Sequence, residues 1–398
     1  HHKSQHLSNA GKKIKKKKKK KKEYIMKFIH LSDLHIGKRV NEFSMIKDQE
    51  FILAQILTII DDEQPQGIFI AGDVYDKSVP SAEAVALFDN FLYSLSERKL
   101  KVFVISGNHD SPERIAFGAR LMNRSGIYMS PVYQKIIEPI RLQDKDGEIN
   151  IYLLPFIKPV QVRAQFPEMT IETYTDALQV AVDQLNIDVS QKNVLLTHQF
   201  VTGSERSDSE DISVGGSDNV SASIFKDFDY VALGHIHKPQ NMGRETIRYC
   251  GTPLKYSFSE AKQRKSVTVV ELQDKGNTVV RTVELIPKRD MVEIKGTYME
   301  LTAKSYYDQM NVEDYVHITL TDEDDILDAL NKLRTIYKNI MKLDYDNQRT
   351  RTNTVISGQA DIENKSPLEL LSEFFELQNN QPLSSMQKTF SEKIINQL

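Results

Sequence analysis

The sequence predicts an α/β protein, because short apolar segments and longer amphipathic segments alternate from Met26 onward. The apolar segments 27–31, 67–71 and 101–105 predict strands, and the helical periodicity between Phe43 and Ile60 and over 81–98 predicts two helices. This β-α-β-α-β order predicts a parallel sheet with right-handed crossovers. Further strands are expected at 149–154, 193–197, 229–233, 246–250, 266–272 and 278–284, with a helix at 173–187. These later strands lie closer together, which predicts a second, largely antiparallel sheet.

The carboxyl-terminal part divides into three further segments. Residues 291–345 predict a small α/β unit, with strands at 291–296, 315–320 and 338–344 and a helix at 324–336. Residues 346–365 are polar, lack hydrophobic periodicity and are typical of a linker. Residues 366–398 predict a helical hairpin, because Ser366 with Glu369 and Ser384 with Gln387 form capping-box patterns. The apolar stripes of the hairpin need a covering surface, either on the same chain or on a partner protein.

Charge divides the chain into two unlike parts. Residues 1–25 hold 11 of the 52 basic residues and one of the 55 acidic residues, so 41 basic and 54 acidic residues remain from Met26 onward. A lysine-rich leader can act as a nucleic-acid-binding arm. We instead expect residues 1–25 to be an artefact and Met26 to be the first residue of the natural protein. Because the body is acidic, any DNA contact must come from a local patch, metal ions or a partner chain.

Composition also bears on the compartment. The only cysteine is Cys250, which excludes an internal disulfide and is consistent with a reducing cytoplasm. The sequence contains no run of 18 apolar residues, so no membrane-spanning helix is expected. We therefore expect a cytoplasmic protein.

Polar side chains follow five of the predicted strands, at the point where each strand ends. The segments are Asp33-Leu34-His35, Gly72-Asp73-Val74-Tyr75-Asp76, Gly107-Asn108-His109-Asp110, Thr197-His198-Gln199 and Gly234-His235-Ile236-His237. In a parallel sheet the carboxyl ends of the strands form the ligand crevice, so these side chains are expected to meet. Carboxylate, imidazole and amide ligands without cysteine suit Mn²⁺, Fe or Zn. Seven candidate ligands suit two ions that share one carboxylate.

These segments resemble those of the calcineurin-like metallophosphoesterase superfamily. More narrowly, residues 26–398 resemble the SbcD family, the nuclease subunits of bacterial SbcC–SbcD complexes and relatives of the eukaryotic Mre nuclease. The matching stretches are HLSDLHIGK (30–38), AGDVYDKSVPS (71–81), SGNHDSPERIAFG (106–118), LGHIHKPQ (233–240), YCGTPLKYSFSE (249–260) and KRDMVEIKGTYMEL (288–301). Cys250, where a small residue such as Ser or Ala is expected, and the lysine leader depart from the family.

The resemblance implies a fold and a set of domains. It implies a four-layer αββα sandwich as the nuclease domain (26–287), a small α/β capping domain (288–345), the linker (346–365) and the hairpin (366–398). The hairpin would bind an SbcC-like coiled-coil ATPase. Nuclease domains would form a homodimer, for which residues 81–98 and 112–124 are candidates, although their apolar side chains suit an ordinary core equally well.

The resemblance also implies the roles of individual residues. Two divalent ions, Mn²⁺ in first place, would be held by Asp33, His35 and His237 on one side, by Asn108, His198 and His235 on the other, and by a bridging Asp73. His109 resembles the family's catalytic histidine, which binds the phosphate and protonates the leaving oxygen.

Two of three nearby residues, Asp76 and Arg114, have two interpretations each. Asp76 either orients His109 or the substrate, or closes its own loop. Asp110 is expected to tether its loop. Arg114 either contacts the DNA backbone or is an ordinary helix-surface arginine.

The implied function is that of a DNA nuclease in recombination, replication and repair. With its ATPase it would act as a 3'-5' double-strand exonuclease and a single-strand or hairpin endonuclease. One alternative is a metallophosphoesterase acting on small molecules or phosphoproteins, which the metal motifs alone do not exclude. Another is a scaffold without catalysis, against which the complete set of ligands and His109 argues.

Overall fold

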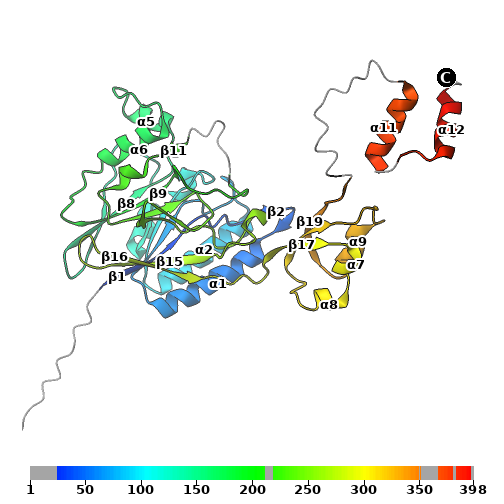
Figure 1. The fold of residues 1–398 in the computed structure, drawn as a ribbon. Coiled ribbons are helices and arrows are strands. Elements are labelled where there is room, and N and C mark those ends of the chain that lie inside the picture. The colour runs from blue at the N-terminus through cyan, green and yellow to red at the C-terminus, as the bar shows by residue number, and fades with distance from the viewer. Residues whose placement is uncertain (1–24, 211–217, 349, 351–365, 380–381, 396–398) are drawn as a thin grey trace, which may run out of the picture.

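The computed structural model describes residues 25–210, 218–348, 350, 366–379 and 382–395. The predicted leader and most of the predicted linker lie outside these residues. Two six-stranded sheets face each other in the amino-terminal body, with α1 (Ile46–Glu63) and α2 (Ala82–Glu97) outside one sheet and α5 (Pro159–Gln165) and α6 (Tyr174–Asp183) outside the other (Figure 1). The predicted four-layer αββα sandwich is therefore confirmed.

The first sheet has a parallel centre, as predicted. Its order is β16 (Thr278–Glu284), β15 (Ser266–Leu272), β1 (Met26–Leu31), β4 (Gly67–Ala71), β5 (Lys101–Ile105) and β6 (Ile127–Met129). The strands from β1 to β6 are parallel, and β15 and β16 add antiparallel strands at the β1 edge. Short elements between them are β2 (Arg39–Val40), β3 (Phe43–Ser44), α3 (Pro112–Ile115), α4 (Ala119–Met122) and η1 (Asn123–Ser125).

The second sheet is mostly parallel, so the prediction of a largely antiparallel sheet is wrong. Its order is β13 (Gln240–Met242), β14 (Arg244–Tyr249), β12 (Tyr230–Gly234), β9 (Lys192–His198), β8 (Glu148–Leu154) and β7 (Ile140–Gln143). Only the two edge pairs are antiparallel. The connections 155–191 and 199–229 are long enough for crossovers, and the closely spaced β15 and β16 belong to the first sheet. Smaller elements here are β10 (Phe200–Val201), β11 (Asn219–Val220), η3 (Ala222–Phe225) and η4 (Phe258–Glu260).

Strand alternation builds the core between the sheets. In β4, Ile68 and Ile70 pack toward α1 and α2, whereas Phe69 enters the layer between the sheets. In β12, Val231 and Leu233 pack toward α6, whereas Tyr230 meets that same central layer. Because β4 and β12 are buried on both faces, they are apolar throughout, and the polar residues of these segments follow at the strand ends. The site is thereby confined to the carboxyl edge.

The small carboxyl-terminal unit, called the capping domain below, has a parallel three-stranded sheet. Its strands are β17 (Met291–Gly296), β18 (Tyr315–Leu320) and β19 (Asn339–Tyr345), and its helices are α7 (Tyr298–Leu301), α8 (Lys304–Tyr307) and α9 (Ala329–Arg334). The helix expected at 324–336 is confined to α9. The capping domain lies beside α1 (Figure 1), where the buried Asp48 accepts hydrogen bonds from Arg289 and from the hydroxyl of Tyr315.

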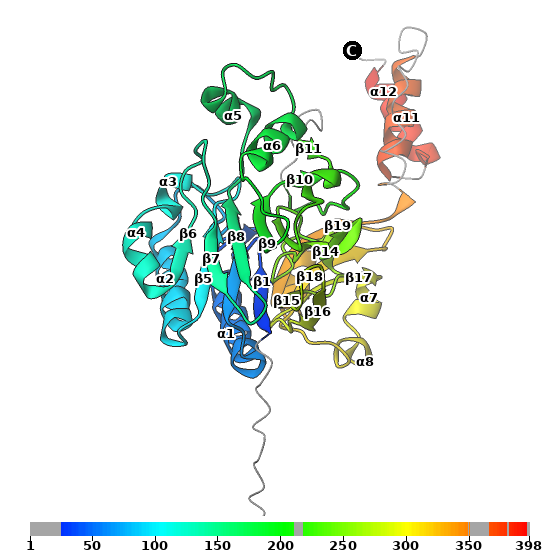
Figure 2. The ribbon, with the colours of Figure 1, turned by 90° about the vertical axis from the view of Figure 1, so that its left-hand side faces the viewer.

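The carboxyl-terminal helices α11 (Pro367–Asn379) and α12 (Ser385–Ile395) lie against each other as a hairpin (Figure 2). The hydroxyl of Ser366 accepts a hydrogen bond from the backbone N–H of Glu369, and the carboxylate of Glu369 accepts one from the backbone N–H of Ser366. Ser384 and Gln387 form the same reciprocal pair. Phe374, Met386 and Phe390 are exposed on the hairpin. Among the described residues no helix has the length and apolar character needed to cross a membrane.

Candidate metal centre

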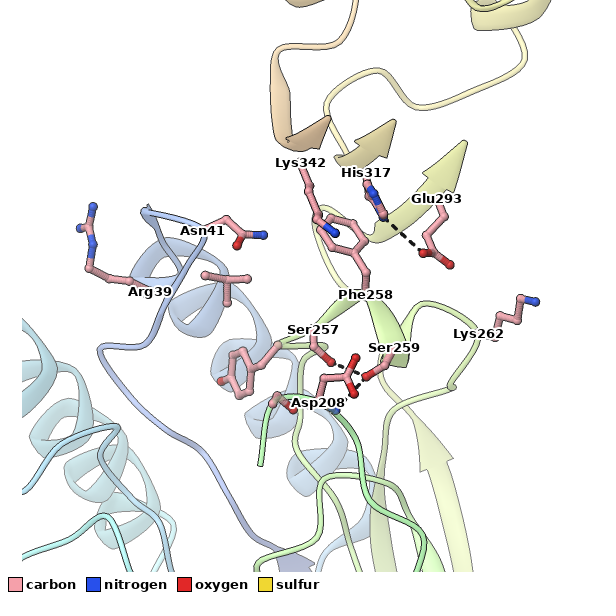
Figure 3. Close-up of a pocket in the computed structure, with 13 residues that line it drawn as sticks. Arg39, Asn41, Asp208, Ser257, Phe258, Ser259, Lys262, Glu293, His317 and Lys342 are labelled. Atoms are coloured by element: carbon pink, nitrogen blue, oxygen red, sulfur yellow. Dashed lines mark hydrogen bonds and ion pairs between the residues drawn. The ribbon is translucent and has the colours of Figure 1, made fainter. Parts of the chain in front are cut away.

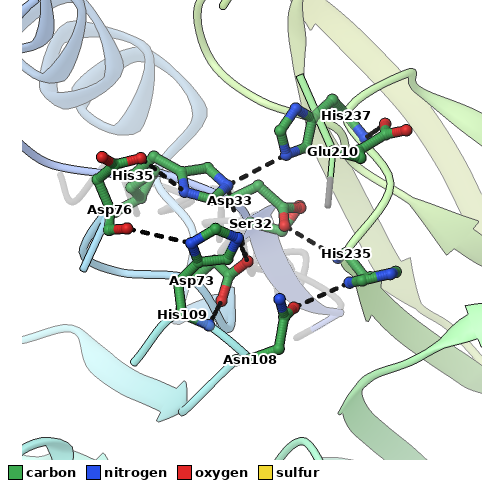
Figure 4. A network of polar contacts seen from close by, with 12 residues as sticks. Ser32, Asp33, His35, Asp73, Asp76, Asn108, His109, Glu210, His235 and His237 are labelled. Carbon is green, nitrogen blue, oxygen red and sulfur yellow. Dashed lines mark hydrogen bonds and ion pairs between the residues drawn. The ribbon is translucent and has the colours of Figure 1, made fainter. Parts of the chain in front are cut away.

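The five polar segments meet at the carboxyl edges of β1, β4, β5, β9 and β12, between the two sheets (Figure 4). Ligand atoms of Asp33, His35 and His237 lie within 4.8 Å of one another, and so do those of Asp33, Asp73 and His198. The structure thus brings together residues that are far apart in the sequence.

Asn108 joins the remaining histidines to this cluster. Its Oδ1 atom lies 3.0 Å from Nε2 of His198 and 2.9 Å from Nδ1 of His235. Asp73 lies in the middle, with Oδ2 at 3.3 Å from His198 Nε2 and 3.7 Å from His35 Nε2. All seven predicted ligands therefore converge, with Asp73 between the two groups of three.

The backbone at the cluster is strained. Asp33, His35, Asp73 and His235 have φ values of 53°, 44°, 48° and 104°, which non-glycine residues rarely adopt. A Cβ atom on Gly107 would lie 2.1 Å from Asp73 Oδ1, and one on Gly234 would lie 1.8 Å from the carbonyl oxygen of Ala71. Such strain persists only where the surrounding structure enforces it, which is typical of functional sites.

The electrostatics favour a cation. Burial lowers the pKa of His235 to about 3, and burial also holds the pKa values of His35 and His237 well below 6.5, so these imidazoles are neutral and can donate a lone pair. Burial, together with the neighbouring Asp73, raises the pKa of Asp33 to about 7. Burial opposes protonation of His198, but the Asp73 carboxylate raises the pKa of His198 to about 9. The imidazole of His198 therefore carries a positive charge next to Asp73, and a bound cation would take the place of that charge.

The residues fit a metal ion in a second respect. The buried Oδ2 of Asp33 has no hydrogen-bond partner among the described residues. Nε2 of His35 and Nε2 of His237 face each other at 3.1 Å. Nδ1 of His198 lies 2.8 Å from the carbonyl oxygen of Ala71, which leaves its Nε2 directed toward Asp73. Nitrogen and oxygen donors in this arrangement suit two divalent ions.

His109 lies at the rim of the cluster and Asp76 beside it (Figure 4). Nδ1 of His109 contacts the backbone oxygen of Asp76 at 3.1 Å, and the imidazole is 17% exposed. The carboxylate of Asp76 instead pairs with Lys38 at 2.7 Å. The backbone oxygen of Asp76 thus contacts the ring of His109 directly. Its carboxylate also lies 3.7 Å from Nδ1 of His35, and ligand atoms of His35, Asp76 and His109 lie within 4.8 Å of one another.

The other two predicted residues lie apart from the ligands. Asp110 is buried and accepts from the backbone N–H groups of Val74, Tyr75 and Gly107, so it ties the loop after β4 to the loop after β5. Arg114 is exposed on α3, and none of its described side-chain contacts reaches the cluster.

Sequence reasoning missed the residues that hold two of the histidines. Gln49 on α1 donates to the carbonyl oxygen of His35 and to the hydroxyl of Tyr256. Ser209 contacts Nδ1 of His237 at 2.6 Å, and Glu210 accepts from the backbone N–H of His237 at 2.6 Å. Tyr256 lies within the stretch 249–260 that carried the family resemblance, which was the available signal. No motif pointed to Ser209 or Glu210.

A cleft of about 670 Å³ lies between the two domains (Figure 3). Ser209 and Tyr256 line it, and across it lie Glu293, His317 and Lys342 of the capping domain. Further lining residues include Arg39, Asp208 and Lys262. The cleft is connected to the cluster through Ser209, which contacts Nδ1 of His237, and through Tyr256, whose ring packs near His35 and His237.

Family comparisons agree with this fold and site. A family model described as calcineurin-like phosphoesterase matches residues 26–239, and one described as type 5 capsule protein repressor C-terminal domain (SbcD_C) matches residues 287–379. The fold and the site thus define a calcineurin-like phosphoesterase. The chain is 33% identical over 369 residues to the SbcD subunit of the SbcCD nuclease of Staphylococcus epidermidis, with 91% of this chain and 96% of that protein covered. The chain belongs to the SbcD family of nuclease subunits.

Two solved structures are distantly similar. TT1561 of Thermus thermophilus is 13% identical, with 65% of this chain and 99% of that chain covered and a TM-score of 0.37. A dimetal phosphatase from Danio rerio is 10% identical, with 66% and 98% covered and a TM-score of 0.38. These scores are too low to carry an argument about function.

Proposed function

We propose that the chain is a DNA nuclease subunit that hydrolyses phosphodiester bonds with two divalent ions, Mn²⁺ in first place. The observation that carries the proposal is the convergence of seven Asp, Asn and His ligands from both sheets on one buried point. The name of the Staphylococcus epidermidis relative supplies the nuclease activity by analogy. When bound, two such ions polarise the phosphate and activate water for attack.

The chain's own residues have separable roles in this proposal. Asp33, His35 and His237 hold one ion, Asn108, His198 and His235 hold the other, and Asp73 serves both. His109 contacts the phosphate and gives a proton to the departing sugar oxygen, for which its partly exposed ring beside Asp73 is suitably placed. The Asp76 carbonyl fixes the orientation of that ring.

The cleft beside the ligands favours DNA over a small phosphate ester. Arg39, Lys262 and Lys342 line it from both domains beside the carboxylates of Asp208 and Glu293, so phosphates spaced along a strand would meet cations on either side, with a small excess of positive charge. Arg114, exposed on α3, is a further candidate contact to the DNA backbone. The acidic body leaves such local cations as the source of DNA affinity.

The proposal extends to partners and domains. Residues 26–287 form the nuclease domain, 288–345 the capping domain, 346–365 the linker and 366–398 the hairpin that binds an SbcC-like ATPase. Exposed Phe374 and Phe390 give the hairpin an apolar surface for such a partner. We also propose that the nuclease domains form a homodimer. The complex acts as an ATP-dependent 3'-5' exonuclease on double strands and as an endonuclease on single strands or hairpins. These activities serve DNA recombination, replication and repair.

Nuclease activity on a labelled DNA hairpin with Mn²⁺ tests the proposal, with and without an SbcC-like ATPase. Asp73→Ala and His109→Ala should both abolish cutting, whereas Asp61→Asn, a surface change on α1, should not. A generic phosphomonoester is assayed in parallel. Hydrolysis of that ester without any DNA cutting, even with the ATPase present, would replace the nuclease by a phosphatase.

A further inference from the structure

His237 differs from His198, another candidate ligand, in how its ring is held. To offer Nε2 to a metal ion, a histidine must carry its proton on Nδ1 and donate it to a neighbour. For His198 that neighbour is a backbone oxygen of β4, which is fixed by the sheet. For His237 it is a side chain, the hydroxyl of Ser209, at 2.6 Å.

The hydrogen bond between Ser209 and Glu260 decides which atom donates in the hydrogen bond between His237 and Ser209. Ser209 Oγ also lies 2.5 Å from Oε1 of Glu260, and a carboxylate can only accept. Ser209 must therefore donate to Glu260 and accept from His237. The proton of His237 is thereby held on Nδ1, and the lone pair of Nε2 faces His35 in the cluster.

Glu260 is anchored firmly enough to impose this order. It is fully buried and pairs with the buried Lys265 at 2.6 Å. Lys265 also donates to the carbonyl oxygen of His237 at 2.9 Å, so one ion pair restrains both the backbone and, through Ser209, the ring of His237. Charge-assisted hydrogen bonds of this kind are stronger than neutral ones.

We propose that Ser209 and Glu260 are positioning residues that keep the Nδ1 proton on His237 and direct its Nε2 toward a metal ion. The inference rests on the proposed metal centre. Ser209 also lines the cleft against the capping domain, together with Asp208, whose backbone N–H donates to Ser259. The positioning hydroxyl therefore lies between the metal ligands and the path proposed for DNA.

Mn²⁺ binding to the full chain, measured by isothermal titration calorimetry, tests the proposal without requiring turnover. The wild-type chain should bind two ions. Ser209→Ala should weaken one of the two sites by about 10–100-fold and leave the other unchanged, because only His237 loses its partner. Ser209→Thr keeps the hydroxyl and should restore the affinity.

A matched control separates positioning from a general loosening of the loops. Ser259→Ala removes a neighbouring hydroxyl that contacts Ser257 and the Asp208 backbone but no metal ligand, so it should bind Mn²⁺ as the wild type does. DNA cutting by Ser209→Ala should recover at saturating Mn²⁺. Unchanged affinity in Ser209→Ala, or equal weakening of both sites, would overturn the role of Ser209. A wild-type chain that binds no Mn²⁺ would instead overturn the metal centre itself.

Discussion

The carboxylate of Asp33 accepts a hydrogen bond from the backbone N–H of His235 at 2.9 Å, although 202 residues separate the two in the sequence. Asp33 follows a strand of the first sheet and His235 follows a strand of the second. One candidate ligand therefore fixes the loop that carries another. The second oxygen of Asp33 has no hydrogen-bond partner among the described residues.

Asp33→Asn should separate folding from metal binding. The amide oxygen can still accept from His235, but a buried negative charge next to Asp73 is removed, and buried unpaired charges destabilise a fold. In EDTA the variant should be as stable as the wild type or more stable by about 1 kcal/mol, while Mn²⁺ affinity falls more than about 100-fold. Thermal unfolding and calorimetry measure the two quantities. A variant that unfolds without metal would show that Asp33 serves the fold instead.

His109→Gln should slow DNA cleavage while leaving both metal ions bound. Loss of a general acid lowers kcat by about 10²–10⁴-fold, and His109 is outside the proposed ligand set. Asp76→Asn should cost less than about tenfold, because the backbone oxygen of Asp76 contacts the ring and its carboxylate pairs with Lys38. Single-turnover cleavage rates at saturating Mn²⁺ compare the two. Equal losses in both variants would assign a role in catalysis to the Asp76 carboxylate.

Arg289→Ala should loosen the capping domain from the nuclease domain. Asp48 is fully buried and keeps only the hydroxyl of Tyr315 as a described side-chain partner once Arg289 is removed. Breaking a buried ion pair from one side costs about 3 kcal/mol, whereas an exposed pair costs less than about 1 kcal/mol. Lys295→Ala, which breaks the exposed pair with Asp346, is the control. Urea unfolding and limited proteolysis near residues 286–290 should show the difference, and equal stability of the two variants would contradict it.

His30 should make the protein less stable in mild acid. Its ring is buried between the sheets against the hydroxyl of Tyr230, and burial lowers its pKa to about 3. The unfolded chain, with a pKa of about 6.5 for this group, binds a proton that the folded chain does not bind between these values. Stability therefore falls as the pH drops below 6.5, by up to about 1.4 kcal/mol per pH unit from this group.

His30→Asn should flatten that dependence, measured by urea unfolding between pH 7 and about 5 in EDTA. Tyr230→Phe removes the same hydrogen bond but keeps the imidazole, so its slope should match that of the wild type. The prediction fails if His30→Asn and the wild type lose stability in parallel as the pH falls.

The sequence by itself determined three adjacent parallel strands of the first sheet, β1, β4 and β5, and the choice of candidate ligands. The strands at 67–71 and 101–105 coincide with β4 and β5, because a strand buried on both faces is a continuous apolar run that ends where polar residues begin. The same rule located Asp33, Asp73, Asn108, His198 and His235, which lie at or just beyond the ends of such apolar runs. Their convergence followed from the common direction of parallel strands.

The pairing of the later strands was decided by the tertiary structure alone. Spacing along the chain did not reveal that β15 and β16 return to β1, or that β8, β9 and β12 run parallel, because strand order depends on the long-range packing of Phe69 and Tyr230 across the central layer. The hydrogen bonds that link His237 to Ser209, and Ser209 to Glu260, could not be predicted either. Side chains that act through another residue follow no periodicity, and only the folded chain brings them within bonding distance.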